Sequence, residues 1–575
     1  MAPLYASIEG HAGALRLFAL VAHAAGRTDD AVTALKRIAV LENDPADILG
    51  AIADTYGKAG RHAEAHDQWA AMVARYPQII EAHLNCAVAA SNAERHDAAV
   101  EAADAGLKRF PGEARLLATK AMALKNADRI EDAVALFEIA VAADPQRALT
   151  RHNQAVTLRA AFRFDEACDA FAEAKRLGMQ GAEFHSNWAA AALEARRIEQ
   201  AERLYLDALR ADPEHPEARR GLTRLKIEYR GGEDAFAHFE EAARQRPKIQ
   251  KPWLDWSKAL MLNRQHEAAL AVAEQGLAAI PGSFALAGVK SYIQGLTGDA
   301  PAALDQLESL LRKQPNDAGL ESLIAEIAFR AARPERAAEL LERRTARDPR
   351  DQLAWSNLAL AWRLMGDERE HWLCDYEGFV MVVEVPSADG ASPGEYAAEI
   401  ASVLEPLHVT TFEPGDQTLR GGTQTGGSLF SRPDPAIQRF RQAVTLAAAK
   451  AVADLPDDPA HPFLGRKSGR FAFSGSWSVR LAAGGHHVSH VHPEGWMSSA
   501  YYARLPTGDE EARGRHEGWI QFGASPEHLG FDLPPRRIVE PRPGRLVLFP
   551  SYMWHGTIPF ESGDRLTAAF DYQPL

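Results

Sequence analysis

The sequence predicts a multidomain chain, in which an all-α superhelix of repeated helical pairs is followed by a β-rich jelly-roll domain with flanking helices. Three observations predict this architecture. Alanine and proline recur every 34 residues through the first two thirds of the chain. The composition changes near Gly366, where glycine, proline and aromatic residues become more frequent. From Arg470 onward, short apolar runs alternate with turn residues, which is typical of a sandwich or a jelly-roll barrel.

Length and composition limit the possible functions. A chain of 575 residues is too long for one hydrophobic core. Its net charge of -14 argues against nucleic-acid binding, because a phosphate backbone attracts a basic surface. Three cysteines are too few for a disulfide framework, and no apolar run is long enough to span a membrane. The apolar stretch 15–25 fits the repeat register better than a signal segment, so we expect no membrane partner and a cytoplasmic protein.

The 34-residue period holds through ten positions. It places alanine at Ala31, Ala65, Ala99, Ala133, Ala167, Ala201, Ala235, Ala269, Ala303 and Ala337. It places proline at Pro77, Pro111, Pro145, Pro213, Pro247, Pro281, Pro315 and Pro349. Met179 breaks the proline series, and Pro45 comes two residues late, which suggests a short insertion in the first repeat. Each period fits two amphipathic helices: a small alanine lets them cross closely, and proline ends the second helix.

These alanines and prolines, together with the aromatic positions between them, resemble the tetratricopeptide repeat. The resemblance covers about residues 10–365, with about ten repeats and a final partial helix at Gln352–Met365. It implies a right-handed superhelix with a concave groove, in which each repeat contacts mainly its neighbours. Such a groove is expected to hold a peptide or protein, either as substrate or as partner. The alternative is that the array only spaces or oligomerises the domain that follows.

The repeat pattern stops near Gly366, so we expect a first domain at residues 1–365 and a second at 366–575. Residues 376–386 are expected to form a first strand, and residues 392–404 and 435–455 are expected to form helices. The later strands are expected at residues 471–481, 496–505, 518–523, 536–541, 544–550, 556–560 and 565–572. In a barrel, strands far apart in sequence meet at one mouth, so residues from early and late strands can form one site.

Histidines in this region indicate a metal site. His490 and His492 follow an early strand, His555 follows a late one, and Arg565 comes ten residues further on. Three ligands on one face of an octahedral metal leave the other positions open for a co-substrate and oxygen. That is the arrangement of non-haem Fe(II) oxygenases, and imidazole suits Fe(II).

Several motifs resemble the double-stranded β-helix family of 2-oxoglutarate/Fe(II) oxygenases, over about residues 400–575. They are His490-x-His492, the run GRLVLFPSYMWH that ends at His555, and Arg565-x-Thr567. In that family an arginine after the distal histidine pairs with the far carboxylate of 2-oxoglutarate. The resemblance therefore implies Fe(II) and 2-oxoglutarate as cofactors, with Arg565 on the carboxylate and Thr567 adding a hydroxyl.

Other segments are similar to a narrower branch of this family, found in bacteria and phages. They are SWSVRL, HVHPEGWMSSAYY, RLTAAFDY and LRGGTQT, the last at residues 419–425. By that resemblance Gln424 is a candidate contact for the co-substrate. Arg480 is a further candidate for binding an anion.

The ligand set has two readings, because the family's usual first motif is His-x-Asp or His-x-Glu. In the first reading the ligands are His490, His492 and His555. In the second, His492-Pro493-Glu494 supplies the histidine and the acid, which makes Glu494 the alternative ligand. We favour the three histidines, because a proline and an immediate Gly-Trp turn make Glu494 a poor strand residue. By themselves, His486 and His487 would be interpreted as surface polarity.

The expected function is an Fe(II)- and 2-oxoglutarate-dependent dioxygenase, a hydroxylase whose catalytic residues are the metal ligands alone. Helical repeats joined to an oxygenase also resemble aspartyl/asparaginyl β-hydroxylases and some prolyl hydroxylases. That resemblance implies a peptide or protein substrate recruited by the groove, and it is a fold-level analogy. The alternative is a protein-interaction scaffold whose oxygenase domain is catalytically degenerate, which the missing acid favours.

Overall fold

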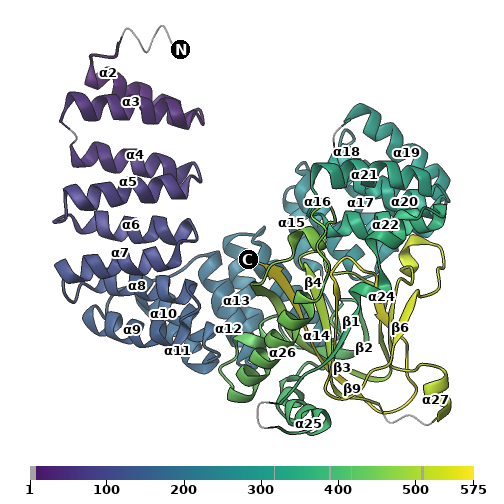
Figure 1. Ribbon diagram of the computed structural model, residues 1–575. Helices are drawn as coiled ribbons and strands as arrows, with labels where there is room; N and C mark the ends of the chain where they lie inside the picture. Colours follow the sequence, from purple (N-terminus) through teal and green to yellow (C-terminus); the bar gives the residue numbers. More distant parts are fainter. Residues whose placement is uncertain (1–7, 44, 316, 388–389, 416, 507–509) are drawn as a thin grey trace. The chain divides into compact units, whose positions relative to one another are not determined.

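The structure is a computed structural model that describes residues 8–43, 45–315, 317–387, 390–415, 417–506 and 510–575. The chain divides into two compact units, Met1–Ala208 and Leu209–Leu575, and each is described by itself. The first unit consists of helical pairs, and the second contains further helical pairs and the β-sheets (Figure 1). No helix in the described part of the chain is long and apolar enough to cross a membrane.

The first unit is a stack of antiparallel helical pairs. Its helices are α2 (Ala12–Ala24), α3 (Thr28–Leu41), α4 (Ala46–Lys58), α5 (His62–Arg75), α6 (Ile80–Asn92), α7 (His96–Arg109), α8 (Ala114–Asn126), α9 (Ile130–Ala143), α10 (Ala148–Ala160), α11 (Phe164–Arg176), α12 (Ala182–Glu194) and most of α13 (Ile198–Ala211).

The same pattern continues in the second unit. Its repeat helices are α14 (Pro216–Arg230), α15 (Ala237–Gln245), α16 (Gln250–Leu262), α17 (His266–Ala279), α18 (Phe284–Thr297), α19 (Ala300–Lys313), α20 (Ala318–Arg330), α21 (Pro334–Arg347) and α22 (Gln352–Met365). The final helix at Gln352–Met365 is therefore confirmed.

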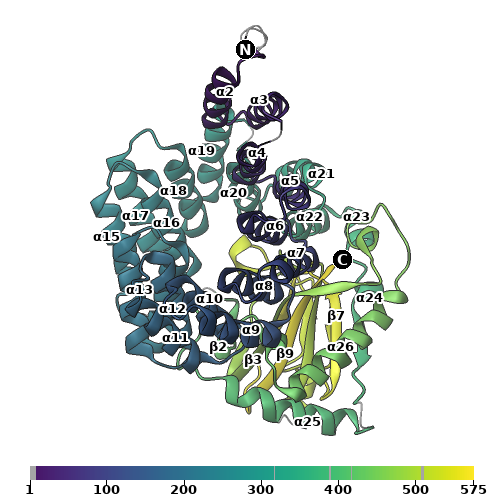
Figure 2. The same ribbon diagram turned by 90° about the vertical axis from the view of Figure 1, so that its left-hand side faces the viewer.

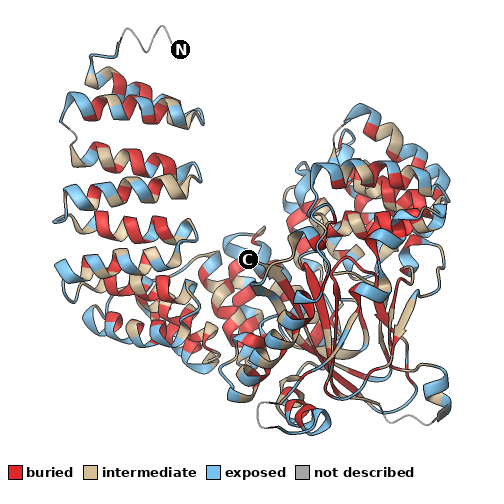
Figure 3. Cartoon of the chain, viewed as in Figure 1, coloured by how far each residue is buried: buried red, intermediate tan, exposed pale blue. Residues whose placement is uncertain are grey.

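The periodic alanines lie in the second helix of each pair, or just before it at Ala235, and all ten are buried. A Cβ added at Gly295 in α18 would lie 3.0 Å from the Cβ of Ala303 in α19, so the two helices touch at this position. Buried residues gather on the facing sides of the helices (Figure 3). A larger side chain than alanine would therefore push the paired helices apart.

The expected insertion near Pro45 is wrong. Helices α2, α4 and α6 begin at Ala12, Ala46 and Ile80, so the first repeat keeps the 34-residue spacing without an extra residue. Pro45 instead stands directly before α4, as its N-cap residue. The fixed φ of proline is tolerated at that place, whereas the other periodic prolines follow the end of a second helix.

The β-sheets of the second unit form two layers. The strands are β1 (Met381–Glu384), β2 (Leu419–Gln424), β3 (Phe471–His487), β4 (Met497–Arg504), β5 (Ile520–Phe522), β6 (Arg537–Val539), β7 (Arg545–Pro550), β8 (His555–Thr557) and β9 (Arg565–Pro574). A six-stranded sheet has the order β1-β7-β4-β9-β3-β2, and a three-stranded sheet has the order β6-β5-β8. All the pairings within the two sheets are antiparallel. The expected fold class, helical repeats followed by a β-sandwich, is confirmed.

Shorter helices complete this part of the chain: α23 (Arg369–Leu373), α24 (Tyr376–Phe379), α25 (Pro393–Leu404), α26 (Pro435–Ala453) and α27 (Glu510–Gly514). Helix α26 lies along the six-stranded sheet (Figure 2), with the Phe440 ring 4.6 Å from the Tyr501 ring of β4. The strand expected at residues 376–386 is only partly correct. Its first half is helix α24, because the Asp375 side chain accepts a hydrogen bond from the Gly378 N–H and caps that turn.

The last repeats and the β-sheets share one hydrophobic core. The Trp554 indole N–H donates to the Ser356 carbonyl at 3.0 Å, and the Phe329 and Phe531 rings are 5.4 Å apart. Arg363 donates to the carbonyl of Gly523 at 2.6 Å. The change of composition near Gly366 is therefore not a change from one separately packed core to another.

Candidate metal centre

A cavity of about 50 Å³ lies between the two β-sheets. Strands β3, β4, β7 and β9 line it from the large sheet, and β5 and β8 line it from the small one. Its lining residues are Trp477, Val479, His487, His490, His492, Ser499, Ala500, Ile520, Phe549, His555, Gly556, Thr557, Arg565, Thr567 and Ala569. This space holds several water-sized groups. The site therefore lies inside the sandwich, where apolar side chains such as Trp477, Ile520 and Phe549 surround the polar ones.

The structure brings His490, His492 and His555 together in this cavity. Each can offer one ring nitrogen, and these nitrogens all lie within 4.8 Å of one another. His490 and His555 also form an isolated antiparallel bridge, with backbone hydrogen bonds of 2.9 and 3.0 Å in the two directions. The bridge fixes the separation of the two backbones, although the residues are far apart in sequence.

Hydrogen bonds set the same tautomer in all three rings. The Nδ1–H of His490 donates to the Val488 carbonyl at 2.9 Å, and that of His555 donates to the Met553 carbonyl at 2.9 Å. The Nδ1–H of His492 donates to Asp571 at 2.8 Å. Carbonyl and carboxylate oxygens only accept, so each Nδ1 carries the proton in the neutral ring. The lone pair of each neutral ring is then on Nε2, the atom that is available to a metal.

Burial keeps at least two of these rings neutral. It lowers the pKa of His490 to about 3 and lowers the pKa of His555 well below its ordinary value. Phe549 contributes to this environment, because its ring centroid lies 4.5 Å from that of His555. A neutral imidazole is the form that binds a metal, since protonation would occupy the lone pair.

Asp571 was missed by sequence reasoning. It is buried at the end of β9, where it accepts from His492 and, at 2.7 Å, from the Ser498 hydroxyl. Arg565, Thr567 and Ala569 line the cavity at alternate positions of the same strand, and Asp571 continues that alternation. The strand period could thus have identified it from Arg565.

Arg565 is a buried cation without an acidic partner. Its side chain is 3% exposed, and Nη1 donates to the Thr557 hydroxyl at 2.7 Å. Its Nε has no hydrogen-bond partner, and among the described residues no carboxylate forms an ion pair with it. The guanidinium lies 5.1 Å from the centre of the Tyr502 ring. Burial lowers the pKa of Arg565, so an anion in the cavity would relieve an uncompensated positive charge.

The other three candidates for binding the co-substrate lie in different places. Thr567 is buried and lines the cavity. Gln424 pairs with Val479, a lining residue, but is not itself part of the lining. Arg480 does not reach the cavity: its Nε donates to Asp564 at 3.1 Å, in an ion-pair cluster that includes Glu405. The reason is strand alternation: Trp477 and Val479 face the cavity, so Arg480, the residue after Val479, falls on the opposite face of β3.

The remaining candidates divide in the same way. Glu494 is exposed and is not among the grouped ligand atoms, while its backbone carbonyl accepts from the Gln573 amide. His487 was interpreted as surface polarity, and that interpretation is wrong. It lines the cavity, with its ring centroid 5.3 Å from that of His490. Its position follows from β3, which continues through the glycine pair to His487 rather than ending before it.

Two segments of the chain match known protein families. Residues 475–571 match the family described as "Putative 2OG-Fe(II) oxygenase", and residues 51–114 match the tetratricopeptide repeat. The chain thus combines tetratricopeptide repeats with a C-terminal segment that matches a "Putative 2OG-Fe(II) oxygenase" domain. A search of curated proteins gave no match.

Solved structures with a similar chain course are helical-repeat proteins. MamA from Desulfovibrio magneticus RS-1 is 16% identical with a TM-score of 0.25, over 29% of this chain and 94% of that one. YrrB, described as a TPR protein with an unusual peptide-binding site, is 17% identical with a TM-score of 0.24, over 32% and 96%. A human IFIT1 dimer with PPP-AAAA is 17% identical with a TM-score of 0.29, over 63% and 88%. TM-scores this low support no conclusion about function.

Proposed function

We propose that this chain is an Fe(II)- and 2-oxoglutarate-dependent dioxygenase that hydroxylates a side chain of a peptide or protein. One observation carries the proposal. Three histidines, each with Nδ1 already occupied by an acceptor, lie beside a buried arginine that has no acidic partner among the residues the structure describes. A metal for the histidines and a carboxylate for the arginine would complete this site.

The ligand set fits Fe(II). Three Nε2 lone pairs converge on one region, which leaves further positions of an octahedral ion open to other ligands. Asp571 accepts a hydrogen bond from the Nδ1–H of His492. This bond orients the His492 ring and makes its Nε2 a stronger electron-pair donor to a metal. The acid that the family usually supplies as a ligand is, in this reading, replaced by an acid that supports one.

The arginine fits 2-oxoglutarate. A guanidinium binds a carboxylate through two parallel N–H donors, and Arg565 keeps its Nε free for such a contact. Thr567, two residues further along β9, lines the same cavity and offers a hydroxyl. We propose that Arg565 and Thr567 hold the carboxylate that does not face the metal. We do not assign Arg480 this role, because its guanidinium is already paired with acids outside the cavity.

With Fe(II) and 2-oxoglutarate bound, the site would supply oxidative decarboxylation coupled to hydroxylation of a C–H bond. The residues of the chain would hold and orient the metal and the co-substrate. The histidines fix the metal against the sheet, Arg565 fixes the direction of the co-substrate, and Trp477 and Phe549 help to exclude water. In this mechanism no side chain needs to act as a general acid or base. The repeats are proposed to recruit the polypeptide substrate.

The proposal is tested by oxygen-dependent formation of succinate from 2-oxoglutarate. The full-length chain is supplied with Fe(II) but no other substrate, and we expect slow turnover that stops when a chelator is added. Loss of turnover in His555→Ala, with Glu494→Gln still active, would support the assignment. Absence of both metal binding and turnover in the unaltered chain would instead favour a scaffold with a degenerate oxygenase domain.

A further inference from the structure

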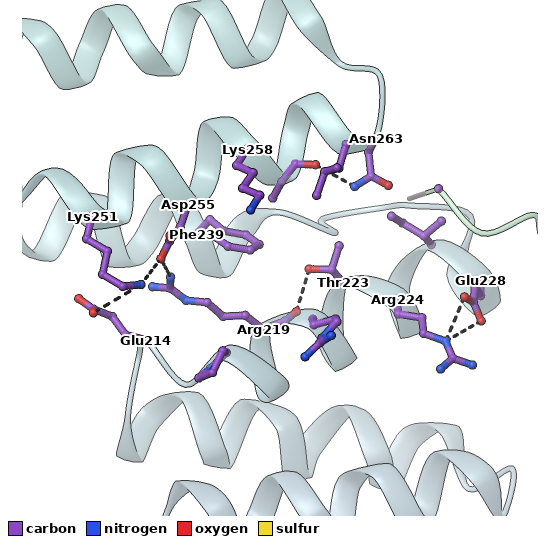
Figure 4. A pocket seen from close by; sticks show the side chains of 16 residues that line it. Glu214, Arg219, Thr223, Arg224, Glu228, Phe239, Lys251, Asp255, Lys258 and Asn263 are labelled. Carbon is purple, nitrogen blue, oxygen red and sulfur yellow. Dashed lines mark hydrogen bonds and ion pairs between the residues drawn. The ribbon is translucent and has the colours of Figure 1, made fainter. Parts of the chain in front are cut away.

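A second and larger pocket lies in the repeats, away from the metal centre. It has a volume of about 330 Å³ and lies mainly between helices α14 and α16, the first helices of two consecutive pairs (Figure 4). Phe239 of α15 and Gly415, from the segment between α25 and β2, complete the lining. All of these residues belong to the unit that also contains the β-sheets.

The pocket is more basic than acidic. Its basic lining residues are Arg219, Arg220, Arg224, Lys251 and Lys258, and its acidic ones are Glu214, Glu228 and Asp255. Each of the three acids is already engaged: Asp255 with Arg219 and Lys251, Glu214 with Arg246, and Glu228 with Arg224. In a chain whose net charge is -14, the lining has five basic residues against three acidic ones, although one of the five, Arg220, pairs with Glu217 outside the lining.

Arg219 is the most constrained of these cations. Its side chain is 4% exposed, its Nε donates to the Pro213 carbonyl at 2.7 Å, and its Nη1 donates to Asp255 at 2.8 Å. Nη2 is buried and has no hydrogen-bond partner. Burial lowers the pKa of Arg219, although Asp255 pairs with its guanidinium, which also lies 5.1 Å from the centre of the Phe239 ring. An additional anion would both occupy Nη2 and offset the cost of burying this charge.

Lys258 adds a second available cation to the lining. Its side chain is exposed, and within the described part of the chain no ion pair is found for it. The same pocket has apolar surface on Phe239, Ile227 and Leu262, and Leu262 is 54% exposed. A ligand that fits must therefore present an anion and an apolar group side by side.

The dimensions favour a polypeptide over a small anion. The lining residues of α14 extend from Pro216 to Glu228, which is about 18 Å along a helix that rises about 1.5 Å per residue. An extended chain covers that length with about five residues at about 3.3 Å each. A single carboxylate would occupy one end of the pocket only.

The segment that contains Gly415 connects the pocket to the β-sheet that carries the candidate metal site. The N–H groups of Thr411 and Phe412 donate to the Glu228 carbonyl at the end of α14. Glu413 pairs with Arg264 at 3.2 Å and accepts from the Gly421 N–H of β2 at 2.7 Å. The next strand, β3, pairs with β2 and ends at His487 in the cavity wall. A ligand in the pocket would thus lie against a segment that is anchored on the sheet holding the metal site.

We propose that this pocket binds an acidic segment of the polypeptide substrate. One carboxylate pairs with Arg219 Nη2 and Lys258, and a neighbouring apolar side chain covers Phe239 and Leu262. The substrate class is therefore a protein with alternating acidic and apolar residues near the modified site. This assignment rests on the proposed hydroxylase function, but its test does not require activity.

The test measures peptide binding to the full-length, metal-free chain by fluorescence anisotropy. The probe is a fluorescein-labelled octapeptide that alternates Glu and Leu, and its matched control carries Gln in place of each Glu. We expect the Glu peptide to bind at least about tenfold more tightly, because a charge-assisted pair is replaced by a neutral contact. Lys258→Glu should weaken its binding at least about tenfold, and Lys258→Arg should retain it.

Arg312→Glu is the matched control, since Arg312 is exposed on α19 and does not line the pocket. It should leave the affinity unchanged. Equal binding of the Glu and Gln peptides, or an unchanged affinity in Lys258→Glu, would overturn the proposal. Displacement of the peptide by free glutarate at equal concentration would also overturn it, in favour of a small-anion site.

Because metal and 2-oxoglutarate are absent from this binding assay, a failure of the pocket proposal leaves the hydroxylase proposal standing. Conversely, binding without any succinate formation would contradict the hydroxylase proposal alone.

Discussion

Asp571 accepts a hydrogen bond from the Nδ1–H of His492, with its two carboxylate oxygens at 2.8 and 2.9 Å from that nitrogen. The carboxylate is buried and also accepts from Ser498, whose hydroxyl oxygen lies 2.9 Å from that of Ser551. The hydrogen bonds from His492 and Ser498, together with the contact between Ser498 and Ser551, hold the Asp571 carboxylate in one orientation. The His-x-His motif lacks an acid, but the site contains one, which contacts a proposed metal ligand through a hydrogen bond.

Replacing Asp571 by Asn should weaken metal binding about 10–100-fold, because a neutral amide oxygen orients His492 but no longer strengthens it as a donor. The chain should remain folded, since the amide can still accept from the Nδ1–H. Competition with a chromophoric chelator measures the affinity. Asp564→Asn is the control, because Asp564 pairs with Arg480 and Arg504 outside the cavity. Equal affinities for the two variants would remove Asp571 from the metal site.

Removing a ligand should have a larger effect. His490→Ala and His555→Ala should each abolish stable Fe(II) binding, because two remaining imidazoles seldom hold this weakly binding ion. Glu494→Gln should keep nearly full metal content, since that side chain is exposed and lies outside the grouped ligand atoms. Metal content after purification without chelator is the measurement. If Glu494→Gln loses the metal while His490→Ala keeps it, the ligand set is His492, Glu494 and His555 instead.

Arg565→Ala should raise the concentration of 2-oxoglutarate needed for half-maximal turnover by at least about tenfold, the effect of losing a buried charge-assisted pair. Arg480→Ala is the matched control, because Arg480 is a nearby arginine whose partners are Asp564 and Glu405. We expect that control to keep the 2-oxoglutarate requirement within about twofold, as surface ion pairs contribute little. If Arg480→Ala raised the 2-oxoglutarate requirement more than Arg565→Ala did, the co-substrate carboxylate would be assigned to Arg480.

The position of the domain boundary can be tested through stability. A fragment of residues 366–575 corresponds to the boundary expected from composition, but it would expose Trp554 and Phe531 where α22 and α20 now cover them. We expect it to unfold at a lower temperature than a fragment of residues 209–575, because apolar burial stabilises by about 25 cal/mol per Å². Thermal unfolding followed by circular dichroism compares the two. Equal midpoints would show that residues 366–575 fold independently.

The repeats could be predicted because the packing between the two helices of a pair depends on residues close together in sequence. A small residue is needed wherever two helices cross, so Ala31 and the nine alanines that follow it repeat the same requirement at a fixed spacing. The start of each pair was also predictable, and Pro45 misled only because one proline can either end a helix or precede the next one. The grouping of His490, His492 and His555 could be predicted for a different reason: histidines on an early and a late strand meet in a barrel.

What could not be predicted depends on register between distant strands. Asp571 supports His492 only because β9 pairs with β3 and β4 and brings the two residues together. The Gln424 position likewise depends on which residue of β3 it faces. Arg480 was assigned by charge alone, although the alternation through Trp477 and Val479 already argued against it. The basic pocket between α14 and α16 depends on packing between repeats, and no single repeat contains it.

The central claim is that His490, His492 and His555 hold the metal through Nε2. It is tested most directly by a crystal structure of the full-length chain with 2-oxoglutarate and Mn(II), which substitutes for Fe(II) without reacting. We expect one ion bound by the three Nε2 atoms, with Asp571 on His492 Nδ1, a co-substrate carboxylate on Arg565 and Glu494 in solvent. An ion coordinated by Glu494, or an ion bound away from His490 and His555, would contradict it.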